Sequence, residues 1–91
     1  MVQQHRDPEA LVEFQRALEL KPDAVLALNG RAGVYLRRKQ YALALADYDK
    51  ALQINPRYGP AYLNRANARE AIGDRPGAAA DRRSEAALRK Q

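Results

Sequence analysis

The sequence of 91 residues is long enough for one small domain with the composition of an ordinary globular protein. Hydrophobic residues make up 46% and charged residues 30%, which is too apolar for a disordered chain. Cysteine is absent, and this excludes disulfides, thiol nucleophiles and zinc–thiolate sites. The net charge of +5 means that an anionic partner such as nucleic acid has to be considered.

Few side chains suit catalysis. The sequence holds one serine, Ser84, one histidine, His5, and no threonine. A nucleophile and its base must lie within hydrogen-bond reach, and these two residues lie near opposite ends of the chain with no third residue to orient them. Neighbouring carboxylates such as Asp81 and Glu85 are typical of a solvated helix surface. We therefore expect no enzyme, and no catalytic, cofactor-binding or metal-binding residue.

Nothing in the sequence predicts membrane association. The longest apolar stretch, Tyr41 to Ala46, is far shorter than a membrane span. The first residues lack the apolar centre of a signal peptide. We expect a soluble cytoplasmic protein with no membrane partner.

Helical signals follow one another along the chain. Asp7 and Pro8 are typical of a helix start, and apolar or small residues then recur at steps of three and four as far as Leu20. Breaks around Pro22, at Lys39 and Gln40, around Pro56 and at Gly73 with Asp74 separate further helical segments. The predicted helices cover residues 8–20, 24–38, 41–54, 58–72 and 76–88. Short breaks between them predict an all-α array of five antiparallel helices.

The sequence also repeats itself with a period of 34 residues. The repeated positions carry small, apolar, acidic and basic residues, and so many matches in one register indicate repeated structure. They are Ala10, Ala44 and Ala78; Glu13, Asp47 and Asp81; Leu20, Ile54 and Leu88; Phe14 and Tyr48; Ala17 and Ala51; Pro22 and Pro56; Leu28 and Tyr62; Arg31 and Arg65; and Ala32 and Ala66.

The unit from residue 25 to residue 58 resembles the tetratricopeptide repeat (TPR), a helical hairpin of 34 residues. The resemblance lies in small and aromatic residues where two helices must approach closely and in a closing proline. These residues are Ala32, Tyr35, Ala44, Tyr48, Ala51 and Pro56, and we expect the first five to be among the best-buried residues. Asn64, Arg65 and Ala66 look like the Asn-Arg-small variant common in bacterial members. The resemblance implies that the hairpins stack as a short right-handed superhelix.

The resemblance covers nearly the whole chain, as one domain over residues 1–91, but both ends depart from it. Residues 8–21 correspond to an unpaired second helix of a first unit, residues 24–56 to a full hairpin, and residues 58–90 to a hairpin with a degenerate, cap-like second helix. In that last helix Arg82 replaces an aromatic residue and Glu85 a small one. The chain is then a C-terminal piece of a longer array or a protein completed by self-association. An open N-terminal edge would expose Leu11, Phe14 and Leu18 and make them a self-association surface.

TPR proteins are non-catalytic scaffolds that bind a peptide or a partner helix in a concave groove, which the first helix of each hairpin lines. The resemblance implies a groove lined by Leu26, Asn29, Gly33, Leu36, Arg37, Leu63, Asn67, Glu70 and Ala71. An Asn amide in such a groove can both donate to and accept from a peptide backbone. The alternatives are that Asn29 and Asn67 are merely exposed and that Gly33 only permits close approach of another segment.

Two specific ligand classes are weakly supported. Members that bind chaperone tails hold a C-terminal carboxylate with Lys, Asn and Arg residues on three first helices. Asn64 matches one such position, but Asn29 and Gly33 replace an expected Lys and Asn, and the third first helix is missing. Nucleic acid is not favoured either, because basic residues are spread along the chain. The one basic run, Arg37 to Lys39, lies at a helix end, where cations also stabilise the helix dipole.

The repeat comparison also predicts a ladder of charges. Arg31 and Arg65 are each followed by an acid sixteen residues later, at Asp47 and Asp81, and Glu13 is the equivalent acid of the first unit. If the hairpins stack in parallel, these five residues can form a continuous ladder in the order Glu13, Arg31, Asp47, Arg65, Asp81. Arginine suits this role because its planar fork can serve two carboxylates.

Overall fold

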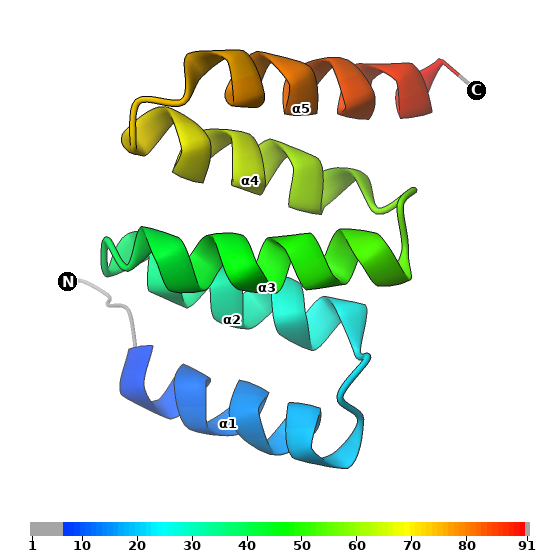
Figure 1. Ribbon diagram of the computed structural model, residues 1–91. Helices are drawn as coiled ribbons and strands as arrows, with labels where there is room; N and C mark the ends of the chain where they lie inside the picture. Colours follow the sequence, from blue (N-terminus) through cyan, green and yellow to red (C-terminus); the bar gives the residue numbers. More distant parts are fainter. Residues whose placement is uncertain (1–6, 91) are drawn as a thin grey trace, which may run out of the picture.

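The computed structural model describes residues 7–90, which form five helices joined by short turns (Figure 1). The helices are α1 (Asp7–Leu20), α2 (Val25–Arg37), α3 (Tyr41–Ile54), α4 (Gly59–Ala71) and α5 (Arg75–Arg89). Each predicted helix is present, and no predicted boundary is more than one residue from the observed one. The all-α prediction is confirmed.

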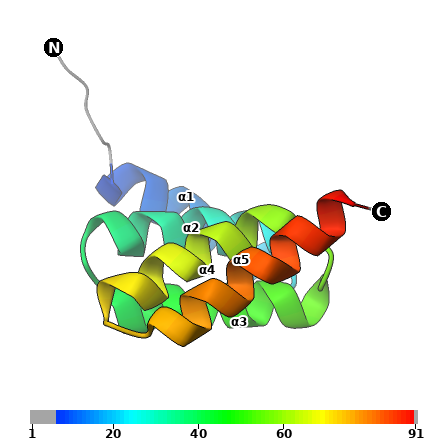
Figure 2. The same cartoon turned by 90° about the horizontal axis from the view of Figure 1, so that it is seen from above.

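The helices form a stack with α1 at one end and α5 at the other (Figure 1), and seen from above α1 and α3 lie along opposite edges of it (Figure 2). α2 packs with α3 and α4 with α5, which gives two hairpins; α3 contacts α4, and α1 contacts α2. α2 and α4, the first helices of the two hairpins, also contact one another. The first helices therefore lie side by side, as the repeat predicts.

The turns between helices follow local backbone chemistry. Pro60 and Pro76 lie in the first turns of α4 and α5, where a missing N–H costs no hydrogen bond. The Asp74 carboxylate accepts a hydrogen bond from the Gly77 N–H at 3.0 Å and caps α5. The turns after α2 and α4 both need a left-handed residue, which is Lys39 with φ 61° in the first and Gly73 with φ 89° in the second.

Small residues let the two helices of a hairpin meet. Ala32, Ala44, Tyr48 and Ala51 are completely buried, which confirms their predicted place in the core. Tyr35 is half-buried and packs against the cluster that Ala32, Ala44 and Tyr48 form. Because alanine has no side chain beyond Cβ, it allows this close helix contact, and the tyrosine rings fill the remaining space.

One bidentate ion pair joins the two helices of each hairpin. Arg31 donates from Nε and Nη2 to the two carboxylate oxygens of Asp47, both at 2.8 Å. Arg65 donates in the same way to Asp81, at 3.0 and 2.7 Å. Asp47 and Asp81 are only 6% and 2% exposed. The predicted pairing of each arginine with the acid sixteen residues later is confirmed.

The continuous ladder is wrong. Between the two hairpins Arg65 bonds to Asp49 at 2.9 Å, and Asp47 already accepts bonds at both oxygens from Arg31. Glu13 is exposed, and it forms no salt bridge within residues 7–90. The pairs are therefore two separate contacts, one in each hairpin, and the link between the hairpins runs through Asp49.

The predicted open edge is only partly open, and the expected exposure of Leu18 is wrong. Leu18 is buried, and Leu11 and Phe14 are half-buried. Phe14 and Leu18 pack in one cluster with Ala27 and Leu28 of α2. The second helix of one unit packs on the first helix of the next, so α2 covers Leu18 and part of Phe14.

No helix within residues 7–90 is both long and apolar enough to cross a membrane.

Lys39 is expected to be a stabilisation site. A non-glycine residue in the left-handed region costs about 1 to 2 kcal/mol, and glycine loses about 0.5 to 1 kcal/mol of additional chain entropy on folding. Lys39→Gly should therefore raise the free energy of unfolding by about 0.5 kcal/mol in urea denaturation. Arg38→Gly is the matched control, because it removes the same charge at a position with φ −87°. It should lower stability, and a stabilising effect there would contradict the explanation.

Candidate functional site

An open cleft of about 470 Å³ follows α2, with α1 on one side and α4 on the other. Its walls combine aromatic, aliphatic and polar side chains from four helices. They are Ala10 and Phe14 of α1; Asn29, Gly30, Gly33, Val34, Leu36 and Arg37 of α2; Tyr48 of α3; and Asn64 of α4.

Four of the nine residues predicted to line a groove lie in this cleft. Asn29, Gly33, Leu36 and Arg37 lie along it. The others do not line it, and all of them are exposed: Leu26, Leu63, Asn67, Glu70 and Ala71. Glu70 is bonded to Arg82, which lowers its pKa by hydrogen bonding and charge. The groove predicted over both first helices is therefore concentrated on α2.

Asparagine amides lie at the side of the cleft nearest α4. The Nδ2 group of Asn64 donates to Oδ1 of Asn29 at 3.3 Å. Both side chains are half-buried, and each amide has further donor and acceptor capacity beyond this bond. Asn29 is thus held in a defined orientation inside the cleft rather than being simply exposed.

Arg37 lies at the side nearest α1. Its Nη2 group donates to Oδ1 of Asp7 at 2.9 Å, and the arginine side chain is 43% exposed. This pair ties the start of α1 to the end of α2. It also supplies a solvent-accessible cation at the rim of the cleft.

The Tyr48 hydroxyl is a buried polar group that no sequence motif predicts. The residue is completely buried, and the hydroxyl forms no hydrogen bond within the described chain. Burial is the main reason that the pKa of Tyr48 is raised to about 12. The phenol is therefore neutral at physiological pH and can donate a hydrogen bond.

Two glycines of α2 have different roles. A Cβ atom on Gly30 would overlap the ring of Phe14, whereas a Cβ atom on Gly33 would meet nothing within 4 Å. The close approach of another segment thus explains Gly30, and the suggestion that Gly33 has this role is wrong. Gly33 leaves open space in the cleft.

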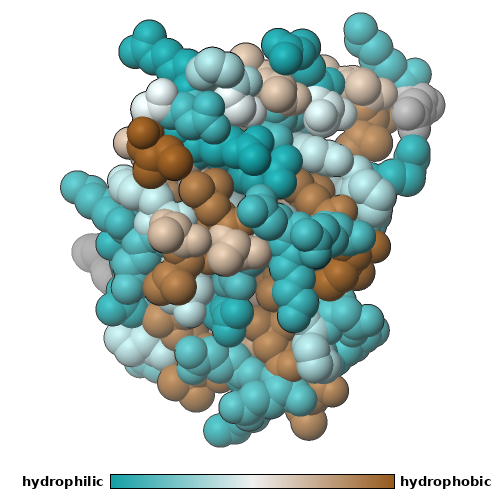
Figure 3. All heavy atoms as spheres, in the orientation of Figure 1, coloured by the Kyte–Doolittle hydropathy of each residue, from teal (hydrophilic) through white to brown (hydrophobic). Residues whose placement is uncertain are grey.

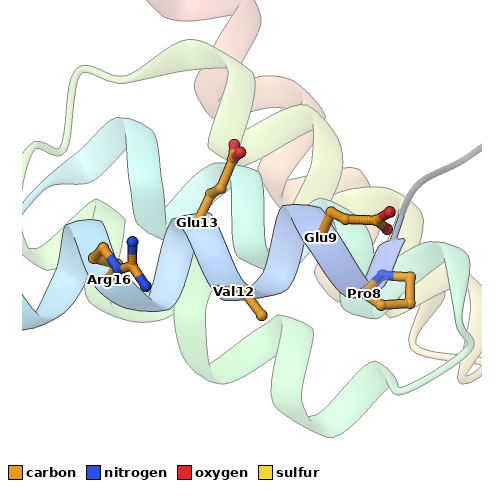
Figure 4. Close-up of a pocket in the computed structure, with 5 residues that line it drawn as sticks. All are labelled: Pro8, Glu9, Val12, Glu13 and Arg16. Carbon is orange, nitrogen blue, oxygen red and sulfur yellow. The ribbon is translucent and has the colours of Figure 1, made fainter.

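A second cavity of about 410 Å³ lies on the outer side of α1 (Figure 4). Its lining comes from that helix alone and consists of Pro8, Glu9, Val12, Glu13 and Arg16. Val12 is 54% exposed. A cavity lined by one helix lacks the convergent groups of a binding site, so the cleft along α2 is the better candidate.

No group of side chains in the described residues suggests catalysis. Ser84 is exposed on α5, and His5 lies outside the described residues. The ionised side chains of the core, Asp47 and Asp81, are fully engaged with arginines.

The model of the tetratricopeptide repeat family matches residues 25–58, which are α2, α3 and the turn that follows. The chain belongs to the tetratricopeptide repeat family. Solved TPR structures confirm the fold over more of the chain than this one repeat. The Arabidopsis OM64 TPR domain superposes with a TM-score of 0.88 and 29% identity over 94% of this chain and 71% of that one.

Another similar solved structure is the first TPR of Spaghetti (RPAP3) bound to the HSP90 peptide SRMEEVD. It has a TM-score of 0.88 and 28% identity and covers 91% of this TPR chain and 66% of that one. TPR arrays are generally non-catalytic protein-interaction modules.

Curated TPR relatives are much larger proteins. The chain is 39% identical over 74 residues to RNA polymerase II-associated protein 3 of Xenopus tropicalis and 32% identical over 69 residues to serine/threonine-protein phosphatase 5 of Homo sapiens. These matches cover 80% and 75% of this chain but only 11% and 14% of the relatives. The shared part is thus a small segment of each relative.

The two glycines give a matched test of the packing of α1. Gly30→Ala should clash with Phe14 and lower the free energy of unfolding by about 1 to 3 kcal/mol. Gly33→Ala should raise it by about 0.5 to 1 kcal/mol, because alanine favours the helix and has room. Urea denaturation followed by circular dichroism measures both. Equal effects of the two substitutions would show that Phe14 does not lie against Gly30.

Tyr48 should make stability depend on pH in alkaline solution. Since its pKa is raised from 10.0 to about 12, the unfolded chain loses this proton at lower pH than the folded chain does. The associated stability is complete below pH 10 and falls as the pH rises towards about 12. Tyr48→Phe should weaken this fall in urea denaturation, whereas Tyr41→Phe should keep it. An unchanged pH profile for Tyr48→Phe would refute the assignment.

Proposed function

We propose that this TPR domain is a non-catalytic scaffold that binds a peptide or a partner helix in the cleft along α2. The observation that carries the proposal is the combination in one cleft of open space at Gly33, an oriented amide pair and an aromatic wall. The amide pair is Asn29 with Asn64, and the wall is Phe14. A concave, mostly apolar site with a few placed polar groups is typical of ligand recognition.

The related structure with a bound peptide supports peptide or protein as the ligand class. The first TPR of Spaghetti (RPAP3) is bound to an HSP90 peptide, and it shares the fold of this chain over most of its length. In this chain Asn64 is retained in the cleft, but Asn29 and Gly33 occupy the places of an expected Lys and Asn. We therefore infer a peptide sequence other than that of the chaperone tail.

Ion pairing engages six of the sixteen basic residues and so weakens the case for nucleic acid as the ligand. Arg31, Arg65 and Arg69 each contact a buried carboxylate of the core. Arg37, Arg82 and Arg89 pair with acids on the surface. Cations that are already paired add little to phosphate binding, which depends on free basic groups. Self-association remains the alternative function, and exposed Val12 and Leu20 on α1 are the apolar residues that would support it.

The test uses a displayed library of random 12-residue peptides selected on the full chain, with affinities of synthetic hits measured by fluorescence anisotropy. Gly33→Leu should reduce the affinity of cleft-binding peptides at least tenfold, because leucine fills the open space without disturbing the core. Asn67→Leu is the control, since Asn67 is the repeat equivalent of Gly33 and lies exposed outside the cleft.

The peptide SRMEEVD serves as the comparison probe and should bind more weakly than the selected peptides. Hits that bind Gly33→Leu and the original chain equally well would contradict the cleft as the binding site. Light scattering across a wide concentration range tests the alternative, which predicts a concentration-dependent dimer.

A further inference from the structure

α1, α3 and α5 occupy equivalent places in the repeat, and α1 is less buried than the other two helices. Ala44 of α3 and Ala78 of α5 are completely buried, but the equivalent Ala10 of α1 is only half-buried. Likewise Tyr48 is completely buried and the equivalent Phe14 is half-buried. What covers α3 and α5 at these positions is the first helix of their own hairpin.

The repeat position that carries an acidic residue in all three helices differs even more in burial. Asp47 and Asp81 are 6% and 2% exposed, and each accepts a bidentate arginine from the first helix of its hairpin. The equivalent Glu13 is exposed and has no salt bridge within residues 7–90. In Figure 4 its carboxylate extends away from α1, on the side opposite to Val12. The carboxylate is thus accessible to a cation from outside the described chain.

The two complete hairpins show what kind of segment fits against such a helix. In both, the covering segment is an α-helix with an arginine followed directly by alanine, Arg31-Ala32 in α2 and Arg65-Ala66 in α4. The arginine bonds to the acid of the opposite helix, and Ala32 packs in one cluster with Ala44 and Tyr48. The chain itself therefore supplies a template for the occupant.

The charge of α1 favours the same occupant. This helix contains four acidic residues, Asp7, Glu9, Glu13 and Glu19, and one arginine, Arg16. It is an acidic element in a chain of net charge +5. A helix with arginine on its contact face is therefore attracted to α1, whereas an acidic segment is repelled.

We propose that Ala10, Glu13, Phe14 and Ala17 form a docking surface on α1 for one amphipathic helix of a protein partner. The helix carries an arginine followed by a small residue. The arginine bonds to Glu13 with its planar fork, and the small residue lies against Ala10. Ala10 and Phe14 also line the cleft along α2, whereas Glu13 and Ala17 do not. The ion pair at Glu13 therefore distinguishes helix docking on α1 from peptide binding in the cleft.

The test uses a synthetic peptide with the sequence of residues 24–38, which contains the template arginine, Arg31. Its binding to the full chain is measured by fluorescence anisotropy. We expect saturable binding that falls about tenfold or more with Glu13→Arg in the chain, and equally with Arg31→Glu in the peptide. Combining the two changes should restore most of the lost affinity, which is the signature of a direct pair.

Glu19→Arg in the chain is the matched control, because the repeat equivalents of Glu19, Gln53 and Ala87, are exposed in the complete hairpins. It makes the same charge change on α1 and should affect the peptide much less than Glu13→Arg. Glu13→Gln provides a milder second variant, and circular dichroism checks that each variant keeps the helix content of the original chain.

Several results would overturn the proposal. An affinity that Glu13→Arg leaves unchanged would mean that the peptide displaces α2 and pairs with Asp47 instead. Absence of saturable binding would show that the surface does not accept a helix of this chemistry. A dimer of the original chain that Glu13→Arg converts to a monomer would assign the surface to a second copy.

Discussion

Burial of two carboxylates constrains how the hairpins are assembled. An ionised carboxylate removed from water is costly unless it is paired and hydrogen-bonded, and Asp47 and Asp81 are almost completely buried. Each hairpin satisfies its carboxylate with a bidentate arginine, and Asp81 receives a third bond from Arg69. Such pairs contribute little net stability, but breaking one leaves a buried charge, so they penalise any shift of one helix along the other. The alanine contacts then form only in that register.

The repeat made most of the fold predictable from sequence. Period, helix breakers and the alternation of alanine with tyrosine are local features, and they placed the five helices and the core correctly. The burial of Leu18 was not predicted, because periodicity shows that Leu11, Phe14 and Leu18 share a face without showing which neighbour covers it. Phe14 and Leu18 pack on α2, the first helix of the next unit, whereas the repeat pattern points to the first helix of their own unit.

The candidate cleft was only half predictable for a related reason. Gly30 and Gly33 are identical in sequence terms, yet one is filled by Phe14 and the other is open, and only the packing distinguishes them. Equivalent positions in the two units also differ in chemistry, with Asn29 and Gly33 in α2 against Leu63 and Asn67 in α4. A family pattern predicts that first helices line a groove, but these differences place the cleft at α2. The unpartnered hydroxyl of Tyr48 has no signature in sequence, because most tyrosines of this pattern are simply core residues.

The double engagement of Arg65 has a consequence for how the molecule opens. This side chain bonds to Asp81 in its own hairpin and to Asp49 in the preceding one, so separating the hairpins disturbs the same guanidinium that holds α4 to α5. In repeat arrays each repeat is stabilised by its neighbours, so the unfolding of one repeat affects the next. Because Arg65 bonds to both hairpins, it strengthens this coupling between α3, α4 and α5. No salt bridge joins Arg31 to α1 in the described chain, where the ionic link is the exposed pair of Arg37 with Asp7. Backbone amides of α1 should thus exchange with solvent through local fraying, while those of the four remaining helices exchange together in a larger cooperative opening.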